Sequence, residues 1–320
     1  MDELYLGVEI GCSKQQIAVC DGEGHIVEMR DANVPHPNGA GDILEWLEES
    51  VDGIIAGHPE IKKIGVGFGG PLETATGRVL VSVQVPGWKD FSLKEWFESR
   101  FGKETIVVND TVAGGYAELN LGSGRGSRVF FYTNIGSGIG GSLFIGGKTW
   151  DGIGFGAAYL GNTYTADWTS DIPGKLARIE ALCCGPAIEA RLKTPGYIPQ
   201  DSIMMEMCGG DVSAADCLML RCACEEGDKF ALDEIGRTGS TFGVGVATVV
   251  SLIGADTIAI GGGVANFGEL LLEPMRRSAE EHAFISARGR FRIVRCAMVK
   301  DNVPVGAALY ARDGFSAVSL

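Results

Sequence analysis

Two polar residues, Asn109 and Asp110, directly follow a run of β-branched residues, Ile106–Val108, that is typical of a buried strand. One interpretation is structural, because Asn and Asp cap helices by accepting hydrogen bonds from first-turn N–H groups. The other is catalytic, because functional groups in open α/β sheets gather at the carboxyl ends of strands. The local sequence is compatible with both, and a small-residue helical pattern does begin at this point.

Three glycine-rich segments could bind phosphate groups or a nucleotide. Residues 135–141 and 9–14 each form a predicted turn between strands, and such a turn exposes backbone N–H groups to an anion. Residues 260–271 place glycines between a strand and a helix, where a base or ribose could lie against bare backbone. The 9–14 turn also carries a carboxylate, a hydroxyl and a cation: Glu9, Ser13 and Lys14. A tight turn without a ligand is the alternative for each, since neither GxxxxGK[ST] nor GxGxxG between strand and helix is present.

The first two glycine turns belong to similar segments of the chain. Residues 4–29 and 128–149 both contain three short strand patterns separated by glycine turns. Each segment therefore predicts an antiparallel meander, and the chain predicts an imperfect duplication.

The spacing of the repeat indicates an insertion in the second half. Aligning Gly11 with Gly136 gives an offset of 125 residues, whereas aligning Gly70 with Gly263 gives an offset of 193. The later offset is larger by 68 residues, so we expect an insertion of about that length between residues 150 and 235.

Helical patterns complete both halves. Apolar residues recur at helical spacing in four segments, which are residues 39–58, 92–102, 233–254 and 268–284. The second of these is expected to be capped by Ser92 and to end at Gly102. Meanders followed by alternating helices and parallel strands predict an α/β fold with two lobes and a ligand cleft between them. We expect the lobes to be residues 1–118, with the acceptor and first phosphate segments, and 119–320, with the nucleotide site.

Composition narrows the class of protein. The chain has 320 residues, of which 45% are hydrophobic, and a net charge of −14. Such a charge argues against general nucleic-acid binding, which needs a basic surface. The N-terminus leads directly into a strand pattern without a signal-peptide pattern, and no apolar stretch is long enough to span a membrane. We therefore expect a cytoplasmic protein that acts on small molecules.

The cysteines predict free thiols rather than a metal site. There are nine of them, an odd number, and their spacing forms no paired C-x-x-C set. The four histidines lie elsewhere in the sequence, whereas a structural zinc needs four ligands at workable spacing. Several cysteines are expected in the core, and no bound zinc is expected.

Taken together, these segments resemble the ROK (repressor, open reading frame, kinase) family of sugar kinases, within the actin-like ATPase (ribonuclease H-like) superfold. The resemblance runs along nearly the whole chain and rests on five segments, GVEIGCSK, GVGFGGPLETATGRVLVSVQVPGW, VVNDTVAGGYAE, IGSGIGG and IAIGGGV. It implies a two-lobed fold, ATP and Mg²⁺ as cofactors, and a homodimer. No helix-turn-helix segment precedes Leu4, so the resemblance is to the kinases rather than to the repressors.

The resemblance also implies roles for individual residues. Asp110 corresponds to the general base, and Glu9 would hold Mg²⁺ through water. The acceptor would be contacted by Asn109, Glu180, Gly70, Gln84, Tyr159 and Asn162. The nucleotide would be bound by Gly11, Cys12, Ser13, Lys14, Gly136, Ser137, Gly138, Gly140, Gly261, Gly262, Gly263 and Val264.

Several positions depart from the family pattern. Glu9 stands where the family has Asp, and Gln84 stands where it has Asn. Residues 159–162, Tyr-Leu-Gly-Asn, replace the family's Glu-x-Gly-His motif, and the zinc-binding cysteine run that should follow is missing. The predicted phosphate-binding segments therefore match the family pattern more closely than the predicted sugar-binding residues do.

These observations predict an ATP-dependent kinase of a sugar or sugar-like polyol, with weak activity on plain glucose. Two alternatives stay open. One is a non-catalytic homologue that senses a metabolite. The other is a kinase for a different acceptor, such as an amino sugar or an acyl derivative, because Tyr159 suits a less polar substituent than a glutamate would.

Overall fold

The computed structural model describes residues 3–12, 14–82, 84–156, 158–298 and 300–318. The chain folds into two compact units. Unit 1 comprises Met1–Tyr132, Gly141–Ala158 and Ala297–Leu320, and unit 2 comprises Thr133–Gly140 and Tyr159–Cys296. These units differ from the lobes predicted as residues 1–118 and 119–320, because the C-terminal residues pack on the N-terminal sheet.

Unit 1 is built on a five-stranded mixed sheet. Its elements are β1 (Leu4–Ile10), β2 (Gln15–Cys20), β3 (Ile26–Ala32), α1 (Ala40–Gly57), β4 (Ile61–Phe68), β5 (Leu72–Glu73), β6 (Arg78–Val79), β7 (Phe91–Ser92), α2 (Leu93–Phe101), β8 (Thr105–Asn109), α3 (Asp110–Leu121) and α10 (Asn302–Asp313). The sheet order is β3-β2-β1-β4-β8, with β5, β6 and β7 in a separate small sheet. Strands β1, β4 and β8 are parallel, and β2 and β3 complete the predicted meander.

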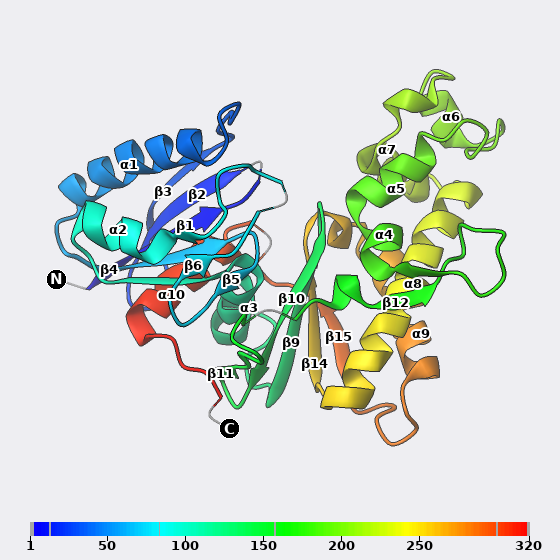
Figure 1. Ribbon diagram of the computed structural model, residues 1–320. Coiled ribbons are helices and arrows are strands. Elements are labelled where there is room, and N and C mark those ends of the chain that lie inside the picture. Colours follow the sequence, from blue (N-terminus) through cyan, green and yellow to red (C-terminus); the bar gives the residue numbers. More distant parts are fainter. Residues whose placement is uncertain (1–2, 13, 83, 157, 299, 319–320) are drawn as a thin grey trace. The chain divides into compact units, whose positions relative to one another are not determined.

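Alternation along β1 explains how the two faces of this sheet are covered. Leu6 and Val8 pack with apolar residues of α1, such as Leu47, whereas Tyr5 points to the other face and packs with Leu309 of α10. Figure 1 shows α1 and α2 on one side of the sheet and α3 and α10 on the other. Successive side chains of a strand point to opposite faces, so one buried strand serves both helical layers.

A buried carboxylate fixes the end of α3. Glu118 has no exposed surface, and its Oε2 accepts hydrogen bonds from the backbone N–H and the hydroxyl of Ser123, at 2.8 and 2.7 Å. The N–H groups of Ala297 and Met298 also donate to this carboxylate, at 3.2 and 2.6 Å. A buried carboxylate is stable only when its oxygens are satisfied in this way. These bonds hold the residues just ahead of α10 within unit 1.

The second half of the chain repeats the topology of the first. Its elements are β9 (Val129–Ile135), β10 (Ile139–Ile145), β11 (Lys148–Thr149), η1 (Leu160–Asn162), β12 (Tyr164–Ala166), β13 (Leu176–Arg178), α4 (Ile179–Cys183), α5 (Gly185–Leu192), α6 (Ile203–Met207), η2 (Val212–Ala214), α7 (Cys217–Glu225), α8 (Lys229–Ile253), β14 (Thr257–Gly261), η3 (Gly263–Phe267), α9 (Glu269–His282) and β15 (Arg292–Arg295). The sheet order β11-β10-β9-β14-β15 is a meander followed by two parallel strands, as in the first sheet. The predicted duplication is confirmed.

A long connection lies where the insertion was predicted. Between β11 and α8 the chain forms η1, β12, β13, α4, α5, α6, η2 and α7, whereas the corresponding connection from β3 to α1 is a short loop. Within the insertion, β12 and β13 form an antiparallel hairpin of their own. Among the described residues, no helix has both the length and the apolar character of a membrane span.

One predicted helix cap is wrong. Ser92 occupies the N-cap position of α2, but its side chain makes no capping hydrogen bond. Ser92 pairs with Arg78 in the small sheet, and the N–H of Lys94 donates to the backbone carbonyl of Gly77 at 3.3 Å. A backbone carbonyl from β6's turn therefore takes the place of the expected hydroxyl. The end of this helix at Gly102, in the left-handed conformation, is as predicted.

Candidate active site

Three strands of unit 1 end at the same level of the sheet. Ile10 pairs with Phe68, and Phe68 pairs with Asn109, so the carboxyl ends of β1, β4 and β8 are adjacent. The N–H of Gly69 donates to the carbonyl of Ile10 at 2.9 Å and closes this edge. Asp110, the first residue of α3, follows directly. The carboxyl edge of a parallel sheet is where ligands bind in open α/β folds.

Asn109 caps α3 and also clamps the neighbouring loop. Its Oδ1 accepts from the N–H and the hydroxyl of Thr111, at 3.0 and 2.5 Å. Its Nδ2 donates to the carbonyls of Phe68 and Gly70, at 3.3 and 3.0 Å. The capping interpretation is confirmed. Both lone pairs of the side-chain oxygen are occupied, so the predicted contact with an acceptor hydroxyl would have to displace or share one of these bonds.

Asp110 has the features of a proton acceptor. Its Oδ1 accepts from the N–H of Thr111 at 2.8 Å, whereas its Oδ2 has no hydrogen bond with any described residue. A Cβ atom added to Gly69 would lie 3.4 Å from Oδ2, so the glycine leaves space beside this oxygen. Burial raises the pKa of Asp110 to about 6, against the lowering effect of its backbone hydrogen bonds. A base with a pKa near the working pH is the kind that general acid–base catalysis requires.

Glu9 lies at the same edge of the sheet, and the negative charge of Asp110 contributes to its raised pKa. Burial raises the pKa of Glu9 to about 7, with further contributions from Asp110 and Asp301 and an opposing one from Lys14. Asp301 was missed by the sequence reasoning, although it directly precedes Asn302, which the later offset of 193 residues places opposite Asn109. Its Oδ1 accepts from Nε2 of Gln16 at 3.4 Å. The signal was therefore present, in the symmetry of the two halves.

The first glycine turn is held by local hydrogen bonds. The N–H of Gly11 donates to the carbonyl of Lys14 at 3.1 Å, and the carbonyl of Gly11 accepts from Nε2 of Gln15 at 2.8 Å. Cys12 and Lys14 are half-buried, and Ser13 lies outside the described residues. The turn stands at the end of β1, next to Glu9. Its role as a phosphate-binding segment stays a prediction.

The second glycine turn, in unit 2, has two N–H groups available. Those of Ser137 and Gly138 donate to no described residue. The N–H of Ile139 donates to Oε2 of Glu180 at 2.8 Å, and that of Gly140 donates to Oδ1 of Asn134 at 2.9 Å. Consecutive free N–H groups in a turn are suited to an anion. Glu180, predicted as an acceptor contact, is thus bound to this turn through one oxygen, and its Oε1 has no hydrogen bond with any described residue.

The third glycine segment lies against the second one. Gly262 has a φ of 84°, and a Cβ atom added there would come within 2.4 Å of the backbone oxygen of Ile135. Gly261 ends β14, and Gly263 begins η3. Next to them is a cavity of about 190 Å³, lined by Cys217, Leu218, Arg221, Gly263, Asn266 and Phe267. A cavity beside bare backbone fits the predicted position of the nucleotide base, and Val264, the residue after Gly263, is buried.

The remaining predicted acceptor residues lie at the surface of their units. Gln84 in unit 1 is exposed, and Tyr159 in unit 2 is 40% exposed. Asn162 is also exposed, and its Oδ1 accepts from Nη1 of Arg178 at 3.2 Å. Their contribution to an acceptor site stays a prediction.

The duplicated sheets and the strand-end site define a class of protein. Two five-stranded sheets, each a meander followed by two parallel strands and with glycine turns at the strand ends, are the architecture of actin-like ATPases. The chain belongs to the ROK family, whose model matches residues 5–313.

Known relatives include both kinases and regulators. The chain is 27% identical to a glucokinase of Thermotoga maritima over 309 residues, which cover 96% of this chain and 97% of that one. It is 26% identical to a putative xylose repressor of Caldicellulosiruptor over 304 residues, 91% of this chain and 73% of that one. Among solved structures, it is similar to a ROK family glucokinase from Streptomyces griseus in complex with glucose and AMPPNP. That comparison has a TM-score of 0.81 and 27% identity, with 97% of this chain and 100% of that one covered.

Proposed function

We propose that the protein is an ATP-dependent kinase that phosphorylates a hydroxyl group of a sugar or sugar-like polyol. The observation that carries the proposal is Asp110, a carboxylate at the carboxyl edge of the sheet with one oxygen free and a pKa raised to about 6. The glucokinases among its relatives support the same reaction.

In the proposed reaction, Asp110 accepts the proton of the acceptor hydroxyl as that oxygen forms its bond to the γ-phosphorus of ATP. The bond between the γ-phosphorus and the bridging oxygen breaks, and ADP leaves with the electron pair. Most of the rate enhancement in phosphoryl transfer comes from positioning the reactants and stabilising charge. One well-placed carboxylate is therefore sufficient as the proton acceptor. The free N–H groups of Ser137 and Gly138 would bind phosphate oxygens.

Glu9 fits the role of a residue that holds Mg²⁺ through water. Its carboxylate is half-buried at the same sheet edge as Asp110, and a divalent cation would favour its ionised form against the burial and the neighbouring negative charges that raise its pKa to about 7. No group of three or more His, Cys, Asp or Glu side chains among the described residues could hold a metal ion. Mg²⁺ in kinase sites takes few protein ligands and keeps several waters, and when bound it neutralises charge on the transferred phosphoryl group.

A coupled assay of ADP release over hexoses, amino sugars, acylated amino sugars and polyols tests the proposal directly. Turnover of at least one acceptor, with ATP consumption that depends on it, is the expected result. Acceptor binding without turnover across the whole set would favour the metabolite-sensing alternative, which the repressors among its relatives keep open. The homodimer also stays a prediction, which light scattering of the purified protein would test.

We expect an acid limb in the pH profile of kcat/KM for the acceptor. The base must be ionised, so activity should fall about tenfold per pH unit below the pKa of about 6 for Asp110 and reach a plateau above it. The folded state binds the protons of Asp110 and Glu9 more tightly than the unfolded chain, so ionising these groups destabilises the fold as pH rises from about 4 to 7. Protonation of these two carboxylates as the pH falls from about 7 to 4 therefore does not destabilise the fold. A profile that stays flat between pH 5 and 7 would remove Asp110 as the titrating base.

We also expect substitutions that restore the family's residues at positions 159 and 162 to raise kcat/KM for a common hexose. A carboxylate that accepts from two hydroxyls discriminates strongly, whereas Tyr159 offers one hydroxyl and a flat apolar face. The double variant Tyr159→Glu with Asn162→His should raise kcat/KM for glucose by roughly tenfold or more. Tyr159→Phe is the matched control and should give no gain. Unchanged kinetics in the double variant would show that these side chains do not contact the acceptor.

A further inference from the structure

The insertion does not provide the zinc site that the family resemblance would imply. Between Asn162 and Glu180 the chain forms the β12–β13 hairpin, and this stretch contains neither Cys nor His. Cys183, just beyond it, is buried, and its Sγ donates to the carbonyl of Thr238 at 3.7 Å. Burial raises the pKa of the Cys183 thiol to about 12, which disfavours the thiolate that a metal ligand must be. The other cysteines of this region also belong to no group of three or more possible metal ligands among the described residues.

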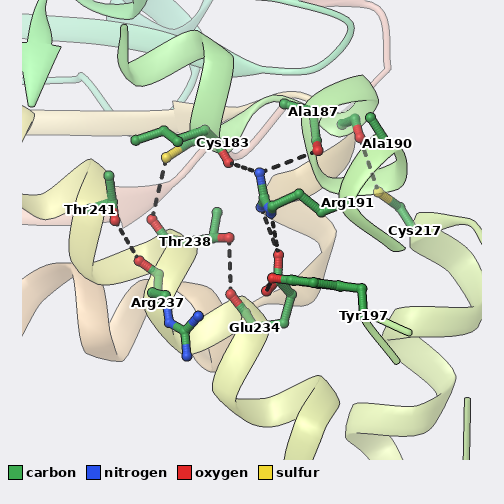
Figure 2. Close-up of polar contacts among 12 residues, drawn as sticks. Cys183, Ala187, Ala190, Arg191, Tyr197, Cys217, Glu234, Arg237, Thr238 and Thr241 are labelled. Carbon is green, nitrogen blue, oxygen red and sulfur yellow. Dashed lines mark hydrogen bonds and ion pairs between the residues drawn. The ribbon is translucent and has the colours of Figure 1, made fainter. Parts of the chain in front are cut away.

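A buried ion pair joins the insertion to helix α8. The guanidinium of Arg191, on α5, donates through Nη2 and Nε to Oε1 of Glu234, on α8, at 2.7 and 2.9 Å. The two side chains are only 11% and 2% exposed. The hydroxyl of Tyr197 donates to the other carboxylate oxygen of Glu234 at 2.6 Å. Figure 2 shows the guanidinium enclosed by these partners, so the buried charges are paired and hydrogen-bonded, as burial requires.

The same arginine binds the end of helix α4. Its Nη1 donates to the carbonyl of Leu182 at 2.8 Å and to that of Ala187 at 3.2 Å. The last carbonyls of a helix have no partner within the helix. A five-residue helix is not stable alone, so α4 depends on such tertiary contacts. Arg191 therefore ties α4 to α5 and, through Glu234, to the long helix α8.

The hairpin is attached to this ion pair by one aromatic ring. Trp168 follows β12, and the guanidinium carbons of Arg191 and Arg237 lie 4.8 and 4.9 Å from the centroid of its ring. A cation over the face of a tryptophan is attracted by the ring quadrupole, more so when desolvated. At the other end of the hairpin, the N–H of Ile179 donates to the carbonyl of Thr163 at 2.9 Å. We call Trp168, Arg191 and Glu234 the arginine clamp.

Glu180 lies on the helix that the arginine clamp holds. It is in the first turn of α4, and its Oε2 accepts from the N–H of Ile139 in the second glycine turn at 2.8 Å. A shift of α4 would break this bond and move the free Oε1. We propose that Arg191 is a positioning residue: the arginine clamp replaces a metal crosslink and fixes α4, so that Glu180 holds the glycine turn with one oxygen and orients the acceptor with the other. The statement about the acceptor rests on the proposed kinase function.

The test uses a variant that removes both buried charges together. Arg191→Met with Glu234→Leu leaves no unpaired buried charge, and such replacements are often neutral for stability. Tyr197→Phe is the matched control, because it removes a hydrogen bond to Glu234 but leaves the contacts of Arg191 with Leu182 intact. Amide hydrogen exchange should become about tenfold faster or more at Ile139 and at residues 183–184 in the double variant, and should stay near wild type in the control.

Kinetics provide the second arm. Acceptor kcat/KM should fall roughly 10²-fold in the double variant, through a higher KM, because misplacing a positioning group has effects of this size. The dissociation constant for ATP without acceptor should change little. The control variant should resemble wild type in both parameters.

The two arms separate this proposal from the proposed function. If no acceptor is phosphorylated, the exchange arm still decides whether the clamp holds α4. Exchange that is unchanged at Ile139 and residues 183–184 in a folded double variant would overturn the proposal, as would an equal rise of acceptor KM in both variants. Metal analysis of the wild type is expected to find no stoichiometric zinc. One zinc per chain, with faster exchange of the same amides after chelation, would assign the role to the metal instead.

Discussion

Asp110→Asn is expected to lower kcat by at least ~10²-fold, the low end for removal of a general base, while ATP binding and the fold stay nearly intact. The amide has no basic lone pair comparable to that of the carboxylate. Its oxygen can still accept from the N–H of Thr111, and the cap of α3 is provided by Asn109, so the local structure keeps its hydrogen bonds. The substitution is therefore close to isosteric, and a loss of rate reports on proton acceptance.

The control is Asp233→Asn, which removes an exposed carboxylate from α8. It should leave turnover and thermal stability unchanged. Single-turnover measurements at saturating ATP and acceptor would separate chemistry from product release. Near-normal turnover by Asp110→Asn would take Asp110 out of the mechanism, whereas a wild-type protein that binds acceptors without turning them over would favour the sensing alternative.

The duplicated architecture could be predicted because glycine turns leave a local signal. The turns around Gly11 and Gly136 mark the two meanders. Gly70 lies just past the end of β4, and Gly263 lies just past the end of β14. A duplication keeps these spacings constant, so a change in offset reveals an insertion. The strand-end position of Asp110 follows from the same logic, since β-branched runs end where the polar residues begin.

The division of the chain into units was not predictable in this way. Helix α10 follows β15 in sequence, yet it packs on β1 and β4 of the first unit. The spacing of its apolar residues indicates an amphipathic helix, but it does not indicate which of the two sheets the helix packs against. The bonds that hold it there, such as those from Ala297 and Met298 to Glu118, join residues almost 180 positions apart.

The contacts that support the residues of the candidate site could not be predicted from the sequence either. Asn109 looked like a cap or a ligand contact, but its two amide hydrogens hold the loop after β4. Trp168, Arg191 and Glu234 belong to no motif, and their partnership depends on how the insertion folds. Ion pairs between distant residues have no spacing rule, unlike the pairs within one helix. Only the absence of a cysteine run indicated that this region needed another means of support.

Gly65→Ala is expected to destabilise unit 1 by about 3–5 kcal/mol, at the upper end of single-substitution effects. Gly65 of β4 pairs with Gly7 of β1, and α10 packs directly on both. A Cβ atom at Gly65 would lie 1.8 Å from the backbone oxygen of Ala307, and one at Gly7 would lie 1.8 Å from that of Pro304. Neither contact can be relieved by a side-chain rotation, because the obstacle is backbone. Differential scanning calorimetry should show a fall in Tm on the order of 10 °C or more.

Gly41→Ala is the matched control for this substitution. Gly41 lies in the first turn of α1, and a Cβ atom there would meet nothing within 4 Å. Because alanine favours helical conformations and restricts the unfolded chain, this variant should change stability by less than about 1 kcal/mol, in the stabilising direction. The opposite effects of one methyl group at two glycines would then measure how closely α10 approaches the sheet. A Gly65→Ala protein with the Tm of wild type would show that this helix does not lie against bare backbone, and with it the packing that places the C-terminal residues in unit 1 would have to be revised.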